Sequence, residues 1–186
     1  MINRILIIFL LLMLSLFTSA ADVQLGLTDI KPEKNAYIHN NFGLMYLDEY
    51  QYAAAIQEFK IAISLNPNSQ ASSVFYNNLG ETYLKLQCYD IAQDCFERAI
   101  NRDPHHFRYY LNLVTVYQNR GLLDTKLAQL IRHKKTPLDD ITIGLIYIAK
   151  GQKSRGIALL DNFVMNEPKL YITEGVKYYL MQFSQK

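Results

Sequence analysis

The sequence predicts an all-α protein built from consecutive pairs of helices, about four pairs followed by a capping helix. Apolar and small residues recur at helical spacing along most of the chain, and no stretch shows sustained two-residue alternation between turn signals. One pattern of residues also repeats along the chain, which is typical of solenoids. Half of the 186 residues are hydrophobic and 19% are charged, so the composition is that of a folded protein.

The first twenty residues have the order of a secretory signal peptide. Arg4 precedes a predominantly apolar run of 13 residues that ends at Phe17, and small residues follow up to Ala20 and Ala21. The run is shorter than the roughly 20 residues that cross a bilayer. We therefore expect residues 1–20 to be cleaved near Ala20 or Ala21, leaving a periplasmic or extracellular protein. An uncleaved leader that anchors the chain in the membrane is the alternative.

Two stretches repeat the same pattern of small and aromatic residues. Gly43 and Tyr46 share one face of a first helix, and Gly80 and Tyr83 repeat them further along the chain. A second helix in each unit carries Ala and Phe at i, i+4 and i+7, namely Ala55, Phe59 and Ala62, then Ala92, Phe96 and Ala99. A proline closes each unit, because proline cannot continue a helix. The small residues should let the two helices approach closely where the large ones interdigitate.

These residues resemble those of the tetratricopeptide repeat family, whose unit of about 34 residues is a pair of antiparallel helices. The resemblance implies a right-handed superhelical solenoid in which the first helices line a concave groove. The match is strong in residues 36–69 and 73–106, and residues 107–136 and 137–170 are expected to form two weaker repeats. Each pair exposes an apolar face that only the next pair covers, so stability requires an array of about three or more.

The third unit departs most from the pattern. Val114 replaces the glycine, Lys126 replaces the first alanine, and Tyr147 follows Tyr117 by 30 residues, four fewer than the period of about 34. We assign the lost turn to the second helix of this unit and its exit. Residues 121–137 should therefore be the least stable part of the array.

The two ends of the array differ in character. Residues 171–186 have apolar residues at helical spacing, with polar residues between them, and are expected to form a capping helix. Residues 21–35 show little periodicity and contain a proline, so we expect them to form an N-terminal extension.

Composition and motifs exclude several classes of function. A net charge of +2 is too small to produce the positive potential expected of a protein that binds nucleic acid. A phosphate-binding loop, a nucleophile elbow, a zinc helix and a Cys-x-x-Cys pair are all missing from the sequence. We expect no enzyme activity, no cofactor and no metal. His105 and His106, and the cationic run at residues 132–135, are expected to be solvated loop and helix-end residues.

The two cysteines are not expected to bridge each other. Cys88 and Cys95 are seven residues apart, which in one helix separates their Cα atoms by about 10 Å, beyond the reach of a disulfide. They should be thiols packed as small hydrophobic groups, and a disulfide to another chain is the alternative.

Asparagines mark the same place in three successive first helices, at Asn41, Asn78 and Asn112, with Asn40 and Asn77 beside the first two. The resemblance implies that these amides face the groove. An amide offers a donor and an acceptor together, so it could bind the main chain of a ligand. Simple membership of the repeat consensus is the alternative. Other groove positions hold Leu44, Glu81, Leu111 and Thr115, without the cationic clamp of the members that bind chaperone tails.

The sequence therefore predicts a non-enzymatic adaptor or scaffold that binds a peptide or a partner helix in its concave groove, through Asn40, Asn41, Leu44, Asn77, Asn78, Glu81 and Asn112. A structural subunit of a cell-envelope or secretion assembly, able to self-associate, is the alternative. Membrane contact is expected only through an uncleaved leader.

Overall fold

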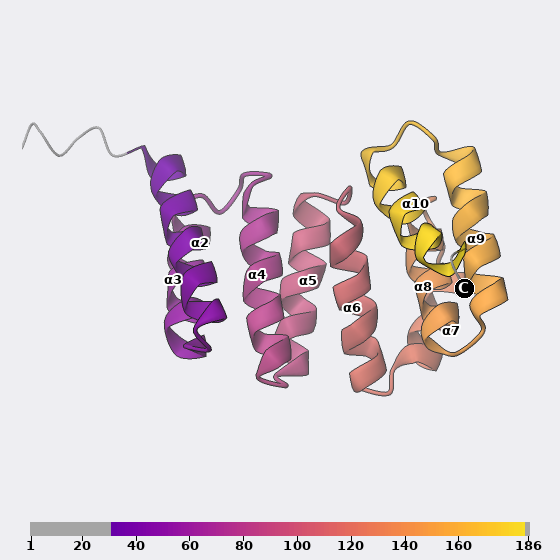
Figure 1. The fold of residues 1–186 in the computed structure, drawn as a ribbon, viewed down its shortest axis with the longest axis horizontal. Coiled ribbons are helices and arrows are strands. Elements are labelled where there is room, and N and C mark those ends of the chain that lie inside the picture. Colours follow the sequence, from indigo (N-terminus) through magenta and orange to yellow (C-terminus); the bar gives the residue numbers. More distant parts are fainter. Residues whose placement is uncertain (1–30, 185–186) are drawn as a thin grey trace, which may run out of the picture.

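The computed structural model describes residues 31–184, and the expected signal peptide at residues 1–20 lies outside them. The described residues form nine helices and no strand (Figure 1). The first helices of the four pairs are α2 (Pro32–Asp48), α4 (Ser72–Lys85), α6 (Phe107–Asn119) and α8 (Asp139–Ala149). The second helices are α3 (Tyr52–Leu65), α5 (Tyr89–Arg102), α7 (Leu123–Arg132) and α9 (Lys153–Asn166), and α10 (Tyr171–Ser184) follows.

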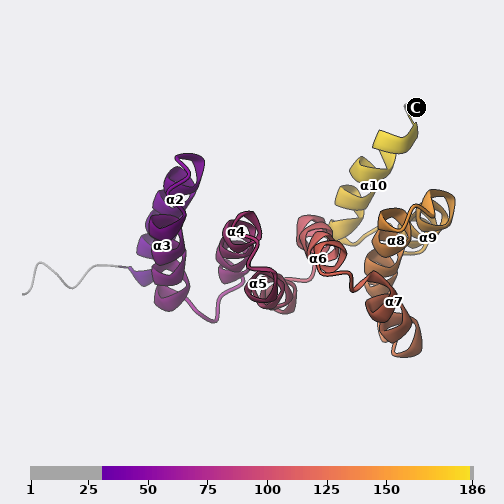
Figure 2. The same cartoon turned by 90° about the horizontal axis from the view of Figure 1, so that it is seen from below.

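The pairs stack side by side along the long axis of the molecule (Figure 1). Seen from below, α2, α4 and α6 lie on one side of the stack, while α3, α5 and α7 lie on the other (Figure 2). At the ends, α2 and α10 project on the same side as α4 and α6 (Figure 2). The surface formed by α2, α4, α6 and α10 is called the concave face below. The predicted all-helical solenoid with a final single helix is confirmed.

Glycine allows the two helices of a pair to touch. A Cβ atom added at Gly43 would lie 2.5 Å from the ring of Phe59, and one added at Gly80 would lie 2.7 Å from the ring of Phe96. Both phenylalanines are fully buried. The spacing of glycine and phenylalanine in the sequence thus corresponds to a direct contact between the first and second helix.

The first helix begins earlier than expected. Residues 32–35, assigned from the sequence to an N-terminal extension, form the first turn of α2, which starts at Pro32. Proline suits this position because its fixed φ is helical and its missing N–H would have no partner within the helix. The proline therefore marks the start of the helix and does not belong to an irregular extension.

The helical turn that the third unit lacks is missing from its second helix, α7, as the sequence predicts. Helix α7 has 10 residues, whereas α3, α5 and α9 have 14 each. The α7 residues are half-buried or exposed, and none is buried. Its leucines are only partly buried against the main core, which extends from α5 to α10. Helix α7 is therefore the part of the stack with the least burial.

We expect residues 121–137 to exchange amide hydrogens faster than any other internal part of the stack. Little apolar surface is exposed when α7 opens, so its opening costs less free energy than opening α3 or α5. Hydrogen exchange followed by mass spectrometry measures this, with residues 52–63 and 89–100 as the internal references. Equal protection in the three segments would contradict the expectation.

Helix α10 caps the solenoid by folding back over it. It packs against α9 and also against α6 of the third pair (Figure 1). The rings of Tyr179 and Phe107 lie 5.3 Å apart, and Gly175 lets α10 approach so closely that an added Cβ would be 2.8 Å from Phe107 Cβ. Ile172 and Val176 are buried in the main core. Within residues 31–184, no helix is both long enough and apolar enough to cross a membrane.

The two thiols should react at very different rates. Cys88 is exposed before α5, whereas Cys95 is buried inside it, where burial raises the pKa of the thiol to about 12. The thiolate is the reactive form, so both the burial of Cys95 and its raised pKa should slow its reaction. Titration with Ellman's reagent at pH 8 should modify one thiol in the native protein and both in guanidinium chloride. Rapid modification of both in the native state would contradict the burial of Cys95.

Candidate partner-binding face

Asparagine side chains link consecutive first helices. The Nδ2 of Asn78 on α4 donates to Oδ1 of Asn40 on α2, at 2.8 Å. The Nδ2 of Asn112 on α6 donates in the same way to Oδ1 of Asn77 on α4, at 2.9 Å. Asn40 and Asn77 are equivalent positions of neighbouring pairs, and so are Asn78 and Asn112, so the same link is repeated along the stack. We call these four residues the asparagine ladder.

The ladder differs from the exposed row of amides that the sequence suggested. Asn40, Asn77 and Asn78 are buried, and Asn112 is half-buried. Asn41 occupies the repeat position of Asn78 but is exposed, because no described helix precedes α2. The amides therefore tie helices together, and a role for them in binding a partner stays a prediction.

Glu81 joins the ladder to a cation. Its Oε1 accepts hydrogen bonds from Nδ2 of Asn77 at 3.0 Å and from Nδ2 of Asn112 at 2.9 Å. The guanidinium of Arg108 on α6 also contacts this carboxylate, at 2.9 Å. Because Arg108 is largely exposed, the ion pair itself contributes little to stability. Arg108 is therefore already paired with a carboxylate on the concave face. The sequence did not predict this pairing.

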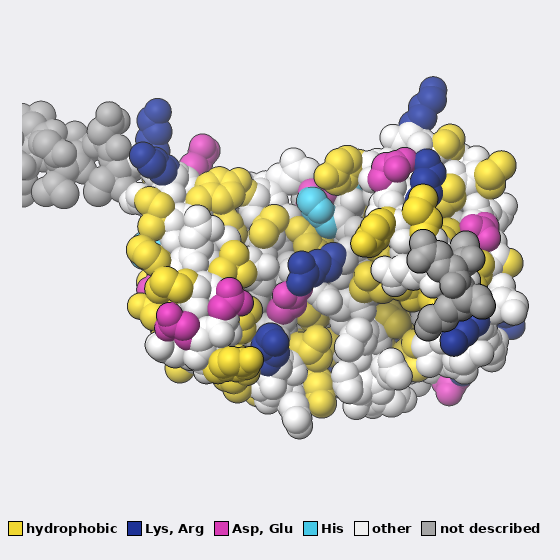
Figure 3. Space-filling view, viewed as in Figure 1, with side chains coloured by type: hydrophobic (Ala, Val, Ile, Leu, Met, Phe, Trp, Pro, Cys, Tyr) yellow, Lys and Arg dark blue, Asp and Glu magenta, His cyan; other side chains and the backbone are white. Residues whose placement is uncertain are grey.

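Apolar side chains remain exposed on the same face. They come from the first helices and from the final helix, and they are Tyr37, Leu44, Val74, Tyr171, Tyr178 and Met181. Figure 3, which views the concave face, shows hydrophobic side chains over α2 on one flank and over α10 on the other. Leu44 is one of the residues predicted to line the groove. Tyr37 and Val74 could have been found from the sequence by continuing the helical spacing of the asparagines.

A cavity of 540 Å³ opens between α6 and α10. Aromatic, aliphatic and charged groups line it together, and they are His105, His106, Phe107, Arg108, Leu111, Tyr171, Ile172, Glu174, Gly175 and Tyr178. Leu111 was predicted at a groove position. The α10 residues in this wall were not predicted, since nothing local in the sequence places α10 beside α6.

The loop histidines belong to the edge of this cavity. His106 and His105 are half-buried, whereas the sequence suggested solvated loop residues. The ring of His106 lies 5.0 Å from that of Tyr109 and 6.0 Å from that of Tyr171, and its Nε2 is 3.0 Å from Oδ2 of Asp103. The histidine thus joins the loop before α6 to the first residue of α10. The correction arises because α10 returns to cover this loop.

The carboxylate of Asp103 also holds the loop before α6 through hydrogen bonds. Burial by itself raises the pKa of this carboxyl, but the backbone N–H of His105 at 3.1 Å, the amide of Gln70 at 2.9 Å and the nearby histidine rings outweigh it. The net pKa lies below its ordinary value. The carboxylate therefore stays charged at neutral pH and holds the loop to the preceding pair.

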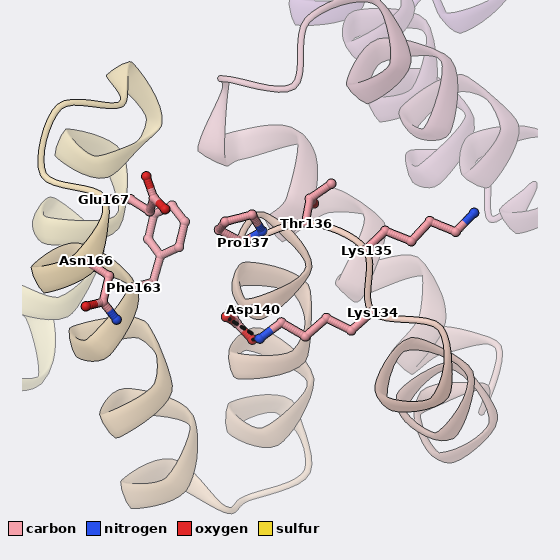
Figure 4. Close-up of a pocket in the computed structure, with 8 residues that line it drawn as sticks. All are labelled: Lys134, Lys135, Thr136, Pro137, Asp140, Phe163, Asn166 and Glu167. Atoms are coloured by element: carbon pink, nitrogen blue, oxygen red, sulfur yellow. Dashed lines mark hydrogen bonds and ion pairs between the residues drawn. The ribbon is translucent and has the colours of Figure 1, made fainter.

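A second cavity, of 420 Å³, lies where the short α7 leaves space beside α8 and α9 (Figure 4). Lys134 points to Asp140, with Nζ 2.7 Å from the carboxylate, while Lys135 extends away (Figure 4). Asp139 accepts the backbone N–H groups of Lys135 and Thr136 at 2.8 and 2.9 Å, which holds the turn before α8. These polar groups bond to one another or to the backbone of the turn before α8. The concave face therefore remains the candidate site.

Comparisons with known proteins agree with this fold. Models of the tetratricopeptide repeat match residues 36–69 and 73–106. The chain is 24% identical over 106 residues to the Photosystem I assembly protein Ycf3 of Prochlorococcus marinus (strain MIT 9303), and 26% identical over 106 residues to that of Synechococcus sp. (strain CC9605). These matches cover 56% of this chain, which spans 61% of the length of these curated relatives.

Among solved structures, the second TPR domain of human RPAP3, determined in complex with an HSP70 peptide, superposes with a TM-score of 0.50 at 18% identity. The match covers 71% of this chain and 97% of that domain. It supports the fold of the stacked pairs. The first two helix pairs of this protein, at residues 36–69 and 73–106, are tetratricopeptide repeats, and they begin an all-helical solenoid that extends through the described chain.

Proposed function

We propose that this protein is a non-enzymatic adaptor that holds a partner protein against its concave face. The observation that carries the proposal is the exposure of apolar side chains from α2, α4 and α10 on the concave face, which also holds the cavity between α6 and α10. Exposed apolar groups gathered on one face are typical of a surface that another molecule covers. The asparagine ladder holds α2, α4 and α6 in register, so the face is preorganised for binding.

The similarity to photosystem I assembly proteins supports a role in assembly, in which the adaptor holds a subunit while a larger complex forms. The partner itself is not transferred from those proteins, because the shared region is only part of either chain. The proposal includes export, with the adaptor acting outside the cytoplasm after removal of the leader.

Site-specific photocrosslinking in the native cells tests the adaptor. Benzoylphenylalanine placed at Leu44, Val74 or Thr115 should give a discrete adduct with the same partner, because these positions lie on the concave face. The matched controls are Ile91 on α5 and Met165 on α9, which are exposed on the second helices. Adducts from the controls alone would instead favour a structural subunit that docks through its other face. No adduct from the concave positions would refute the adaptor.

A further inference from the structure

The side of α2 that points away from α4 has an apolar packing face without a described partner. In α4 the equivalent face packs against the preceding pair and is at most 5% exposed, and it consists of Phe75, Leu79 and Thr82. In α2 the same repeat positions hold Ile38, Phe42 and Met45, which are 40–45% exposed. Helix α2 stands at one end of the stack, and no described helix precedes it (Figure 2).

The second helix of the first pair does not extend this apolar face. In α5 the buried Cys95 packs against the preceding pair, whereas α3 has Glu58 at that repeat position. Oε2 of Glu58 lies 2.6 Å from Nδ1 of His39 on α2. A further helix pair stacked on this end would bury these polar groups, and removing charge from water costs free energy. The face therefore suits a single helix that lies along α2.

Opposite charges stand at the two ends of the apolar face. Lys34 lies one turn before Ile38, Glu49 lies one turn after Met45, and both charged residues are exposed. Positions 34, 38, 42, 45 and 49 fall within an arc of about 80° on a helix with 3.6 residues per turn. The ion pairs of the described residues include neither charge, and Glu49 accepts a hydrogen bond from Gln51 at 2.9 Å.

This order of side chains is complementary to itself when two copies of α2 run antiparallel. Pairing about a point between residues 41 and 42 sets Lys34 opposite Glu49 of the second copy and Ile38 opposite its Met45. The two Phe42 rings then lie on either side of that point. The other end of the stack offers no comparable face, because α8 has no exposed large hydrophobic side chain and α9 has only Met165.

We propose that two copies of this chain form a dimer through α2, antiparallel and related by a two-fold axis between residues 41 and 42. The interface continues the stacking by which consecutive pairs already pack. Because the axis is perpendicular to α2 and lies in the plane between the copies, both concave faces open to the same side. The dimer goes beyond the adaptor function and does not depend on it.

Sedimentation equilibrium of the protein purified from its native cells tests the dimer. We expect reversible dimerisation that Phe42→Asp weakens at least about tenfold, because two charges would be buried at the centre of the interface. Phe42 is 45% exposed, so this variant should fold, and circular dichroism checks that it does. Ile91→Asp is the matched control, since Ile91 on α5 is 48% exposed and the dimer should be unchanged.

Charge reversal tests the antiparallel arrangement. Lys34→Glu and Glu49→Lys should each weaken the dimer about threefold or more, because each sets like charges opposite one another twice in a two-fold interface. The double variant restores opposite charges at both places, so it should recover the native affinity. A parallel pair of helices would not show this recovery.

Three results would contradict the proposal. A monomer at every concentration, or a dimer that survives Phe42→Asp, would overturn the α2 interface. Single charge variants without effect, or a double variant that does not recover the native affinity, would overturn the antiparallel pairing. None of these results changes the adducts expected from the concave face, so failure of the dimer is distinguishable from failure of the adaptor.

Discussion

Gly80→Leu should lower the free energy of unfolding by about 1–3 kcal/mol or more, and Gly43→Leu should have a similar effect. A side chain at Gly80 must enter the space of the fully buried Phe96 ring, since even its Cβ would approach to 2.7 Å. The helices of the pair cannot separate without exposing their shared core. Denaturation in urea, followed by circular dichroism at 222 nm, measures the change.

Two further variants distinguish overpacking from an effect of helix propensity. Ala53→Leu places leucine on an exposed position of α3 and should leave stability within about 0.5 kcal/mol of the native value. In a double-mutant cycle, Phe96→Leu should relieve part of the cost of Gly80→Ala, because a smaller side chain frees space beside the new Cβ. Unchanged unfolding of both leucine variants at Gly43 and Gly80 would show that the close contact does not form.

Asn78→Ala should destabilise the protein by about 1–3 kcal/mol, because it leaves the buried Oδ1 of Asn40 without its donor. Asn41→Ala is the matched control. It removes the same side chain from the same repeat position, but Asn41 is exposed, so stability should change by no more than about 0.5 kcal/mol. Thermal and urea unfolding of the two variants under identical conditions provide the comparison.

A double substitution tests whether Asn40 and Asn78 stabilise the protein through their mutual hydrogen bond. Replacing both Asn40 and Asn78 with leucine removes donor and acceptor together, and its cost should be smaller than the sum of the two single costs. If Asn78→Ala unfolds like the native protein, the ladder is not an internal tie. Its amides would then be free to bind a ligand's main chain, as the sequence-based hypothesis held.

The sequence alone was enough for the helix pairs and for the contacts inside each pair. Gly43 and Phe59, like Gly80 and Phe96, meet through the spacing of residues within two consecutive helices, and this spacing is local. The short α7 was also predictable, because a missing turn shifts every later residue of the period. The start of α2 at Pro32 was missed, although proline in a first turn is a local signal that could have placed it.

Only the tertiary structure decided how polar and apolar groups are distributed on the concave face. Asn41 and Asn78 have the same local sequence context, yet one is exposed and the other is buried, because burial depends on whether another helix stacks beside them. The return of α10 to α6 likewise depends on packing between segments more than sixty residues apart, through Phe107, Gly175 and Tyr179. Periodicity specifies which face of a helix is apolar. Which distant element covers that face is decided by shape and by the surface left over when the pairs have stacked.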